Sequence, residues 1–247
     1  MKMNYVVSVG IALLSTVWVQ AQTVYSVNVV GFQKLQIPPG GFAFSSTPFD
    51  AGTNTLNGVI GKQGEDIGLG NGDSIFTWDG VGYKKFVRFP ETGADARDGL
   101  WVDASFTIAT NDIATGTGFI YQNKQATTQE IVVVGEVLDD TQNSLAVPAG
   151  LSLLSYSYSS DIPLNGTSLT NLATQTDEIF VFDTASQGYQ KYTYFANVGD
   201  PVRNFKWLDA GFLPTDLVLE TGNSFFYRNK AAGFVWTEDL PYDLQGN

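Results

Sequence analysis

Apolar and polar residues alternate over short runs in this chain, and glycine-containing turns separate the runs. In residues 73–79 (DSIFTWD) and 177–183 (DEIFVFD), Ile and Trp or Phe alternate with more polar residues. A short loop with glycine follows each run, and then a second run begins, at Tyr83 and at Tyr189. A period of two across a short glycine-containing loop predicts a β-hairpin in each place. Asp79-Gly80 is a good turn dipeptide for the first hairpin.

Further short apolar runs predict more strands, whereas helical periodicity is scarce. Residues 55–60 and 168–173 are each long enough for about one helical turn. The chain is therefore expected to be all-β. The additional strands are expected at residues 24–30, 41–49, 118–122, 130–137, 151–158 and 224–228.

The chain also repeats itself, and a repeat decides the domain organisation. From Gly82 onward the two copies stay in register at an offset of 106 without a gap. We therefore predict an internal duplication with units of roughly 105 residues. The matching blocks are IPPG (37–40) with VPAG (147–150), DSIFTWD…GYKKF (73–86) with DEIFVFD…GYQKY (177–192), WVDASF (101–106) with WLDAGF (207–212), and TGTGFIYQNK (115–124) with TGNSFFYRNK (221–230).

The predicted fold is two tandem antiparallel β domains, each a sandwich or an open barrel, packed side by side. Aligning residues 134–136 with 30–32 divides the chain into a first repeat at 22–128 and a second at 129–247. The stretch 130–137 can belong to the sheet of either unit, so the halves need not separate cleanly.

The motifs VPAG-LSLLS, DEIFVFD…GYQKY, TGNSFFYRN and VVGF (29–32) resemble those of duplicated, exported bacterial β proteins of unknown function. Those proteins carry a "PAGfsLvs…iykWdG..Y…GeGFFvrN" pattern in each half. The resemblance covers most of residues 24–236, although the GeGFF word is changed here to GTGFIY and GNSFFY. It implies a fold and export, and it carries over no catalytic or binding residue.

The N-terminal residues predict export. Lys2 is followed by an uncharged stretch at 5–19, and Val19-Gln20-Ala21 supplies short side chains at a signal-peptidase site. Residues 1–21 are therefore expected to be a signal peptide, with the mature chain beginning at Gln22. The protein is expected in the periplasm, at the cell surface or outside the cell. No membrane span is expected in the mature chain, because no second apolar run of about 20 residues follows.

Charge and composition exclude several function classes. The net charge is −12, and loss of Lys2 with the leader makes it −13, which disfavours nucleic acid and anionic membranes as partners. The chain has no cysteine and no histidine. Disulfides, Ser-His-Asp and Cys-His catalytic sites and the usual zinc ligands are therefore excluded.

Carboxylates remain for catalysis, and glycoside hydrolysis needs two of them flanking the scissile bond. Asp103 and Asp209 are the tempting pair, since each lies in a W-[VL]-D-A-x-F block. A duplicated position usually does one structural job twice, such as accepting turn N–H groups. Asp79 and Asp183, at the hairpin turns, have the same explanation. We therefore expect no enzyme.

Calcium is the one cofactor that the composition leaves open, because it binds oxygen ligands in flexible geometry. The segment 66–73 offers Asp66, Asn71 and Asp73 near glycines, and a second cluster offers Asp139 and Asp140. Neither fits the EF-hand spacing. Solvated turns are the favoured interpretation, and calcium at one cluster is the alternative.

Aromatic residues suggest carbohydrate binding, because Trp and Tyr faces stack on sugar rings. The recurring pairs Trp78/Phe182, Trp101/Trp207 and Phe119/Phe225 are expected in the core, since burying such a ring stabilises the fold by roughly 4–6 kcal/mol. Unpaired aromatics are the better ligand-binding candidates. These are Tyr156, Tyr158, Tyr192 and Tyr194, which alternate in one copy only.

Two loops, 90–99 and 196–204, differ between the copies, and a binding specificity is expected there if one exists. The favoured function is a non-catalytic, exported binding or surface-associated module with polysaccharide or matrix as ligand. The alternative is a structural protein that self-assembles outside the cell through its β edges. A carboxylate-based glycoside hydrolase is the least favoured class.

Overall fold

The alternating runs of the sequence form antiparallel strands in the computed structural model, which describes residues 29–61 and 72–243. The expected signal peptide and the start of the expected strand at 24–30 lie outside these residues. Within the described ranges, helices are short, and none is long and apolar enough to cross a membrane. The protein is all-β.

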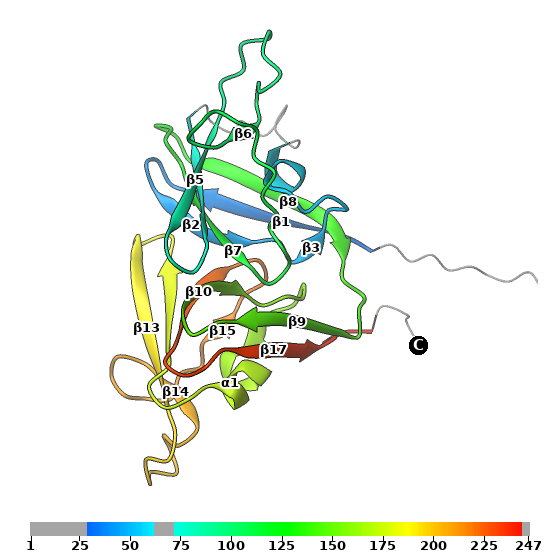
Figure 1. Cartoon of the computed structure of the whole chain (residues 1–247). Helices are drawn as coiled ribbons and strands as arrows, with labels where there is room; N and C mark the ends of the chain where they lie inside the picture. The colour runs from blue at the N-terminus through cyan, green and yellow to red at the C-terminus, as the bar shows by residue number, and fades with distance from the viewer. Residues whose placement is uncertain (1–28, 62–71, 244–247) are drawn as a thin grey trace, which may run out of the picture.

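The elements follow one another along the chain as Figure 1 labels them. They are β1 (Val30–Ile37), β2 (Phe42–Ser46), β3 (Phe49–Asp50), a π-helical turn (Asn57–Gly61), β4 (Ser74–Trp78), β5 (Tyr83–Arg88), β6 (Trp101–Val102), β7 (Gly118–Gln122), β8 (Gln129–Val137), β9 (Gln142–Val147), β10 (Gly150–Ser155), β11 (Ile162–Pro163), a 3-10 turn (Leu164–Gly166), α1 (Ser168–Leu172), β12 (Glu178–Asp183), β13 (Gly188–Phe195), β14 (Lys206–Leu208), β15 (Val218–Leu219), β16 (Ser224–Asn229) and β17 (Phe234–Asp239).

Two five-stranded sheets dominate the fold, and their strands follow the same order. The first sheet is β2-β7-β4-β5-β6 and the second is β10-β16-β12-β13-β14. Both predicted hairpins are present, with Trp78 opposite Tyr83 in one and Phe182 opposite Tyr189 in the other. We call residues 30–137 the first half and residues 142–239 the second half.

Among the described residues, one smaller sheet accompanies the first half and two accompany the second. β1 pairs with β8 along its whole length, and β3 pairs with β8 at Phe49 and Asp50. In the second half β9 pairs with β17, and β11 with β15. The boundary drawn at 128/129 would give β8 to the second repeat, yet its hydrogen bonds are with strands of the first half. The stretch 130–137, which the sequence left open between the two units, thus pairs with strands of the first half.

Each half has its own core, and the recurring tryptophans lie at the centre of these cores. Trp101 and Trp207 are both 0% exposed. Trp101 makes an edge-to-face contact with Tyr121 at 5.8 Å between ring centroids, and Trp207 makes the same kind of contact with Tyr227 at 6.2 Å. The prediction that these residues are core is confirmed, as it is for Phe119 and Phe225, whereas the third recurring pair, Trp78 and Phe182, is only partly buried.

A third apolar cluster joins the halves, because the central strands are buried on both faces. In β7, Phe119 and Tyr121 point into the first core while Ile120 points into the shared cluster. Phe226 of β16 does the same for the second half. Strands that are buried on both faces consist mostly of consecutive apolar residues. This explains the sequences GFIYQ of β7 and SFFYRN of β16.

Backbone hydrogen bonds reinforce this junction. The N–H of Ser46 donates to the carbonyl of Gly222 at 2.9 Å, and the N–H of Ser155 donates to the carbonyl of Gly116 at 2.8 Å. β2 thus continues onto the turn before β16, and β10 onto the turn before β7. The halves share a continuous β framework, so they do not separate cleanly.

In each half, a buried carboxylate binds the turn that follows one central strand. This strand is β7 in the first half and β16 in the second. Asp73 and Asp177 are both 0% exposed. Asp73 accepts hydrogen bonds from the Tyr121 hydroxyl at 2.5 Å and from the Lys124 N–H at 2.7 Å. Asp177 accepts the equivalent bonds from the Tyr227 hydroxyl at 2.6 Å and from the Lys230 N–H at 2.7 Å.

These tyrosines predict a loss of stability in alkali. Burial first, and then the hydrogen bond to aspartate, raise the pKa of Tyr121 and of Tyr227 well above the ordinary value of 10.0. Above pH 10 the unfolded chain loses protons that the folded chain keeps, so the free energy of unfolding falls as pH rises. Each such group contributes up to about 1.4 kcal/mol per pH unit. Urea unfolding between pH 8 and pH 11.5 measures this slope.

The double variant Tyr121→Phe, Tyr227→Phe is the control, because it has no proton to lose at these positions. Its slope above pH 10 should be shallower than that of the parent protein. Equal slopes would show that the two tyrosines do not carry the alkaline transition.

Candidate functional site

The four tyrosines selected from the sequence lie in the core of the second half and not on a surface. Tyr156 and Tyr158 are 1% and 0% exposed, and Tyr192 and Tyr194 are 8% and 3% exposed. The alternation that placed Tyr192 and Tyr194 on one sheet face is real, but that face is the buried one. The four side chains therefore present little surface to a ligand.

The calcium candidates are not brought together either. Asp66 and Asn71 lie outside the described residues, and the Asp73 carboxylate is buried against Tyr121 and the Gln125 amide. Asp139 and Asp140 are exposed in the turn between β8 and β9. Among the described residues, no group of three or more Asp or Glu side chains is placed to hold a metal ion.

The recurring turn aspartates satisfy backbone N–H groups, as predicted. The Asp103 carboxylate accepts from Ser105 and Thr107, and the Asp209 carboxylate accepts from Gly211 and Leu213 at the same relative positions. Asp79 and Asp183 cap the hairpin turns in the same way. Each of these carboxylates therefore stabilises its own turn.

A groove with a volume of about 800 Å³ lies between the halves. It lies where the edge strand β2 and the turn before it meet the tip of the β12–β13 hairpin, beside the face of β4, β5 and β7. Its lining is mainly aromatic and apolar. The lining residues are Pro38, Pro39, Gly40, Gly41, Phe42, Phe44, Phe76, Tyr83, Ile120, Phe182, Ala185, Gln187 and Tyr189.

Tyr83 and Tyr189 are the exposed rings of this groove. They stand 106 positions apart, each begins the second strand of a hairpin, and they are 52% and 53% exposed. Tyr83 rests against Trp78 at 4.9 Å and Tyr189 against Phe44 at 5.6 Å, both edge to face. Their neighbours hold both rings in place while one surface of each remains open to the groove.

Burial and proximity also affect the tyrosine hydroxyls. Burial, followed by the influence of the nearby Tyr83, raises the pKa of Tyr189 to about 12. Burial also raises the pKa of Tyr83. Both hydroxyls therefore stay protonated at neutral pH, where each can donate one hydrogen bond and accept others.

The two halves satisfy the backbone hydrogen bonds of their edge strands, β2 and β10, with different side chains. This difference makes the groove asymmetric. Phe42 and Leu151 occupy equivalent edge positions, since their partners Gln122 and Arg228 stand 106 apart. The Leu151 carbonyl accepts from the Trp78 indole N–H at 2.8 Å. Phe182 replaces that tryptophan in the other half and has no donor.

Gln187 takes over this role beside the groove. Its side-chain oxygen accepts from the Phe42 N–H at 2.7 Å, and its side-chain nitrogen donates to the Phe42 carbonyl at 2.9 Å. The amide thus occupies the free edge of β2 as a neighbouring strand would. Phe182 lines the groove, whereas the equivalent Trp78 donates its indole N–H to Leu151.

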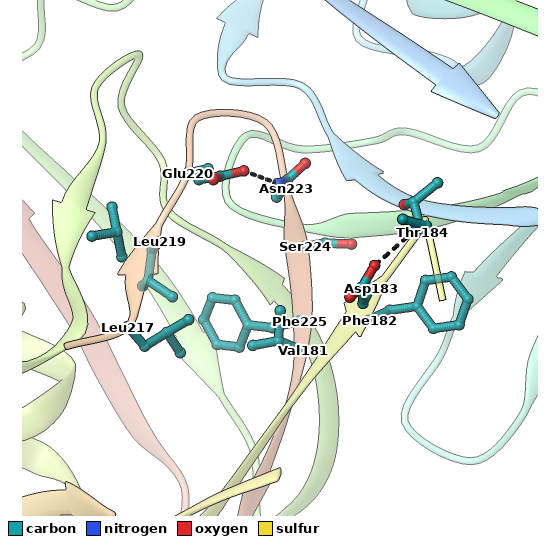
Figure 2. A pocket seen from close by; sticks show the side chains of 12 residues that line it. Val181, Phe182, Asp183, Thr184, Leu217, Leu219, Glu220, Asn223, Ser224 and Phe225 are labelled. Carbon is teal, nitrogen blue, oxygen red and sulfur yellow. Dashed lines mark hydrogen bonds between the residues drawn. The ribbon is translucent and has the colours of Figure 1, made fainter. Parts of the chain in front are cut away.

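A second hollow of about 370 Å³ lies on the other side of the same hairpin tip, between β12 and the β15–β16 segment. Figure 2 shows Asp183 and Glu220 on its walls, with the Asn223 amide donating to Glu220 at 2.8 Å. Hydrogen bonds from Ser186 and Ala185 lower the pKa of Asp183, which keeps this carboxylate charged. This hollow is therefore acidic, whereas the described residues that line the 800 Å³ groove are aromatic, apolar or uncharged.

The two variable loops lie far from the groove. The loop between β5 and β6 and the loop between β13 and β14 extend at opposite ends of the molecule (Figure 1). Neither loop contributes a residue to the lining of the groove, which consists of strands and hairpin tips. The groove therefore does not support the expectation that these loops determine binding specificity.

Tyr83 and Tyr189 are among the aromatic residues whose type suggests sugar stacking, but the sequence favours the unpaired tyrosines over them, because recurrence indicates a structural role. A usable signal existed: both follow the hairpin glycines Gly82 and Gly188 directly, and strand ends beside turns are commonly exposed.

Comparisons with protein-family models, with curated protein sequences and with solved structures found no match to this chain. The likeness to duplicated exported β proteins stays a prediction from the motifs.

Proposed function

We propose that this protein is a non-catalytic, exported binding module that holds a polysaccharide in the groove between its halves. One observation carries the proposal: two half-exposed tyrosine rings, Tyr83 and Tyr189, open into one groove of about 800 Å³. Aromatic faces offer stacking surfaces to sugar rings, and the protonated hydroxyls offer hydrogen bonds. A concave, mainly apolar hollow with a few polar groups is the usual form of a ligand site.

A tandem duplication accounts for the paired rings. The two large sheets share one strand order, and equivalent side chains make equivalent bonds. Asn123 donates to the Pro38 carbonyl as Asn229 donates to the Pro148 carbonyl. In this interpretation the duplicated framework serves stability, and the differences at Phe182 and Gln187 open a ligand site on one side only.

The alternative, extracellular self-assembly, is supported by the edge strand β1. Val30 and Phe32 are 64% and 68% exposed on this strand, which pairs on one side only. An exposed apolar edge can pair with another chain. The groove favours binding over assembly, because it is concave and aromatic whereas the β1 edge presents only two exposed apolar side chains.

Tryptophan fluorescence tests the binding proposal. Trp101, Trp207 and Trp236 are at most 2% exposed, whereas Trp78 is partly exposed and contacts Tyr83. Titration with a panel of neutral and acidic polysaccharides should change the emission of the full chain in a saturable way. The change should disappear in Trp78→Phe, which places in the first half the residue that the second half has at Phe182. A flat response across the panel would refute glycan binding.

A further inference from the structure

One face of the second large sheet leads from the groove to a cluster of cations. Phe182 and Tyr189 line the groove, and they pair with each other across β12 and β13. Two residues further along each strand, on the same face, lie Phe180 and Lys191, which also pair. The face therefore continues from the aromatic groove to Lys191, about 7 Å along the strand from Tyr189.

Three cations surround a single carboxylate at the far end of this face. Glu178 lies within 3.3 Å of Lys191, 2.9 Å of Arg228 and 3.1 Å of Lys230. The Glu178 side chain is only 13% exposed, whereas the three cations are 39–52% exposed. Three cations minus one carboxylate leave a surplus of two positive charges facing solvent.

The cluster differs from its counterpart in the first half. Glu178 pairs with Arg228 across the sheet, and the equivalent pair in the first half is Ser74 with Gln122. Arg228 also stacks over the Phe180 ring at 5.1 Å, which continues the aromatic surface toward the charges. The first half keeps lysines at the positions of Lys191 and Lys230, namely Lys85 and Lys124, so Arg228 and its partner Glu178 are what distinguish the second half.

We infer that the polysaccharide of the groove is anionic, with its carboxylate or sulfate groups bound by Lys191, Arg228 and Lys230. This inference rests on the proposed function, and charge complementarity carries it. The net charge of −12 repels an anionic polymer at long range, but physiological salt screens charges more than about 8 Å apart, so the local cations dominate at the cluster. Desolvation opposes ionisation of Glu178, but bonds and charges from Lys230 and Lys191 still lower its pKa, so the cluster stays ionised at neutral pH.

Calorimetric titration of the full chain with two matched polymers tests the inference. Polygalacturonate carries one carboxylate per sugar, and its fully methyl-esterified form has the same backbone without the charge. Polygalacturonate should bind at least about tenfold more tightly, and added NaCl should weaken its binding but not that of the ester.

Variants assign the effect to the cluster. The double variant Lys191→Gln, Arg228→Gln should weaken polygalacturonate binding by about tenfold or more and leave the ester unaffected. Lys34→Gln is the matched control, because Lys34 is an exposed, ion-paired strand cation on a different sheet, and it should change nothing. Glu178→Gln should tighten polygalacturonate binding, since the surplus rises to three charges, and a folding defect would not imitate a gain.

The outcomes separate this inference from the proposed function. Equal affinity for the two polymers, or no effect of the double variant, would overturn the inference that the ligand is anionic. The groove would then remain a proposed site for a neutral glycan. Absence of binding to both polymers, together with a flat response to neutral glycans, would overturn both proposals.

Discussion

Replacement of Asp177 by alanine is expected to lower the free energy of unfolding by about 3–5 kcal/mol. The carboxylate is fully buried and accepts four hydrogen bonds, from the Tyr227 hydroxyl, the Lys230 N–H and the N–H and hydroxyl of Thr174. Alanine would leave the buried Tyr227 hydroxyl and three partly buried donors without their acceptor, and an unsatisfied buried group costs about 1–3 kcal/mol. Urea unfolding measured at pH 7 gives the value directly.

Asp73→Ala is expected to cost a similar amount, because Asp73 accepts from the equivalent tyrosine and lysine N–H and also from the Gln125 amide. Asp216→Ala is the control, since Asp216 is exposed and its loss should change stability by less than about 0.5 kcal/mol. If Asp73→Ala and Asp177→Ala were as mild as the control, the equivalent networks would not be what stabilises the two halves.

Tyr189→Ala is expected to weaken glycan binding by roughly 5- to 150-fold. The range follows from the 1–3 kcal/mol that one stacked ring contributes in aromatic stacking on nucleic-acid bases. Tyr83→Ala should have an effect of the same order, because the two rings have equivalent positions and nearly equal exposure. Calorimetric titration with the best polysaccharide of the panel measures both.

Two controls separate stacking from unfolding. Tyr189→Phe keeps the ring and should retain most of the affinity, losing only what the hydroxyl contributes. Phe212→Ala removes an aromatic ring that is 59% exposed outside the groove, and it should bind like the parent protein. Loss of binding in Phe212→Ala with retention in Tyr189→Ala would place the ligand elsewhere.

The fold was largely predictable because two patterns of the sequence agree. One is the alternation of apolar and polar residues within each run, and the other is the recurrence of the runs at an offset of 106 residues. The hairpins at 73–89 and 177–195 combine alternation with turn glycines, and both are present. The run at 118–122 is β7. Aromatic residues that recur at the offset of 106, such as Trp101 and Trp207, lie in equivalent surroundings. Local propensity and long-range packing favour the same structure at these positions.

The closing strands were harder to predict because their pattern is mostly polar. β9 (QNSLAV) and β17 (FVWTED) pair only with each other and keep one face in solvent, so few of their positions are apolar. The site of β8 also depends on a partner about 100 residues away, β1, which no local signal identifies.

The candidate site could not be predicted, because recurrence alone does not distinguish buried from exposed positions. Trp207 recurs and is 0% exposed, whereas Phe212, five residues later in the same block, recurs and points outward with a positive φ of 59°. Tyr83 and Tyr189 belong to the exposed class, and their groove exists only because the two sheets pack against each other. The unpaired tyrosines, favoured on sequence grounds, fill the second core.

Hydroxyl-radical footprinting with residue-resolved mass spectrometry tests the central claim, that ligand binds between the halves, most directly. In saturating polygalacturonate, Tyr83 and Tyr189 should be strongly protected from oxidation, while Phe106 and Phe212, which are at least as exposed, should react as in the free protein. Unchanged oxidation of Tyr83 and Tyr189 in a bound complex, or protection confined to Phe106 and Phe212, would contradict the account.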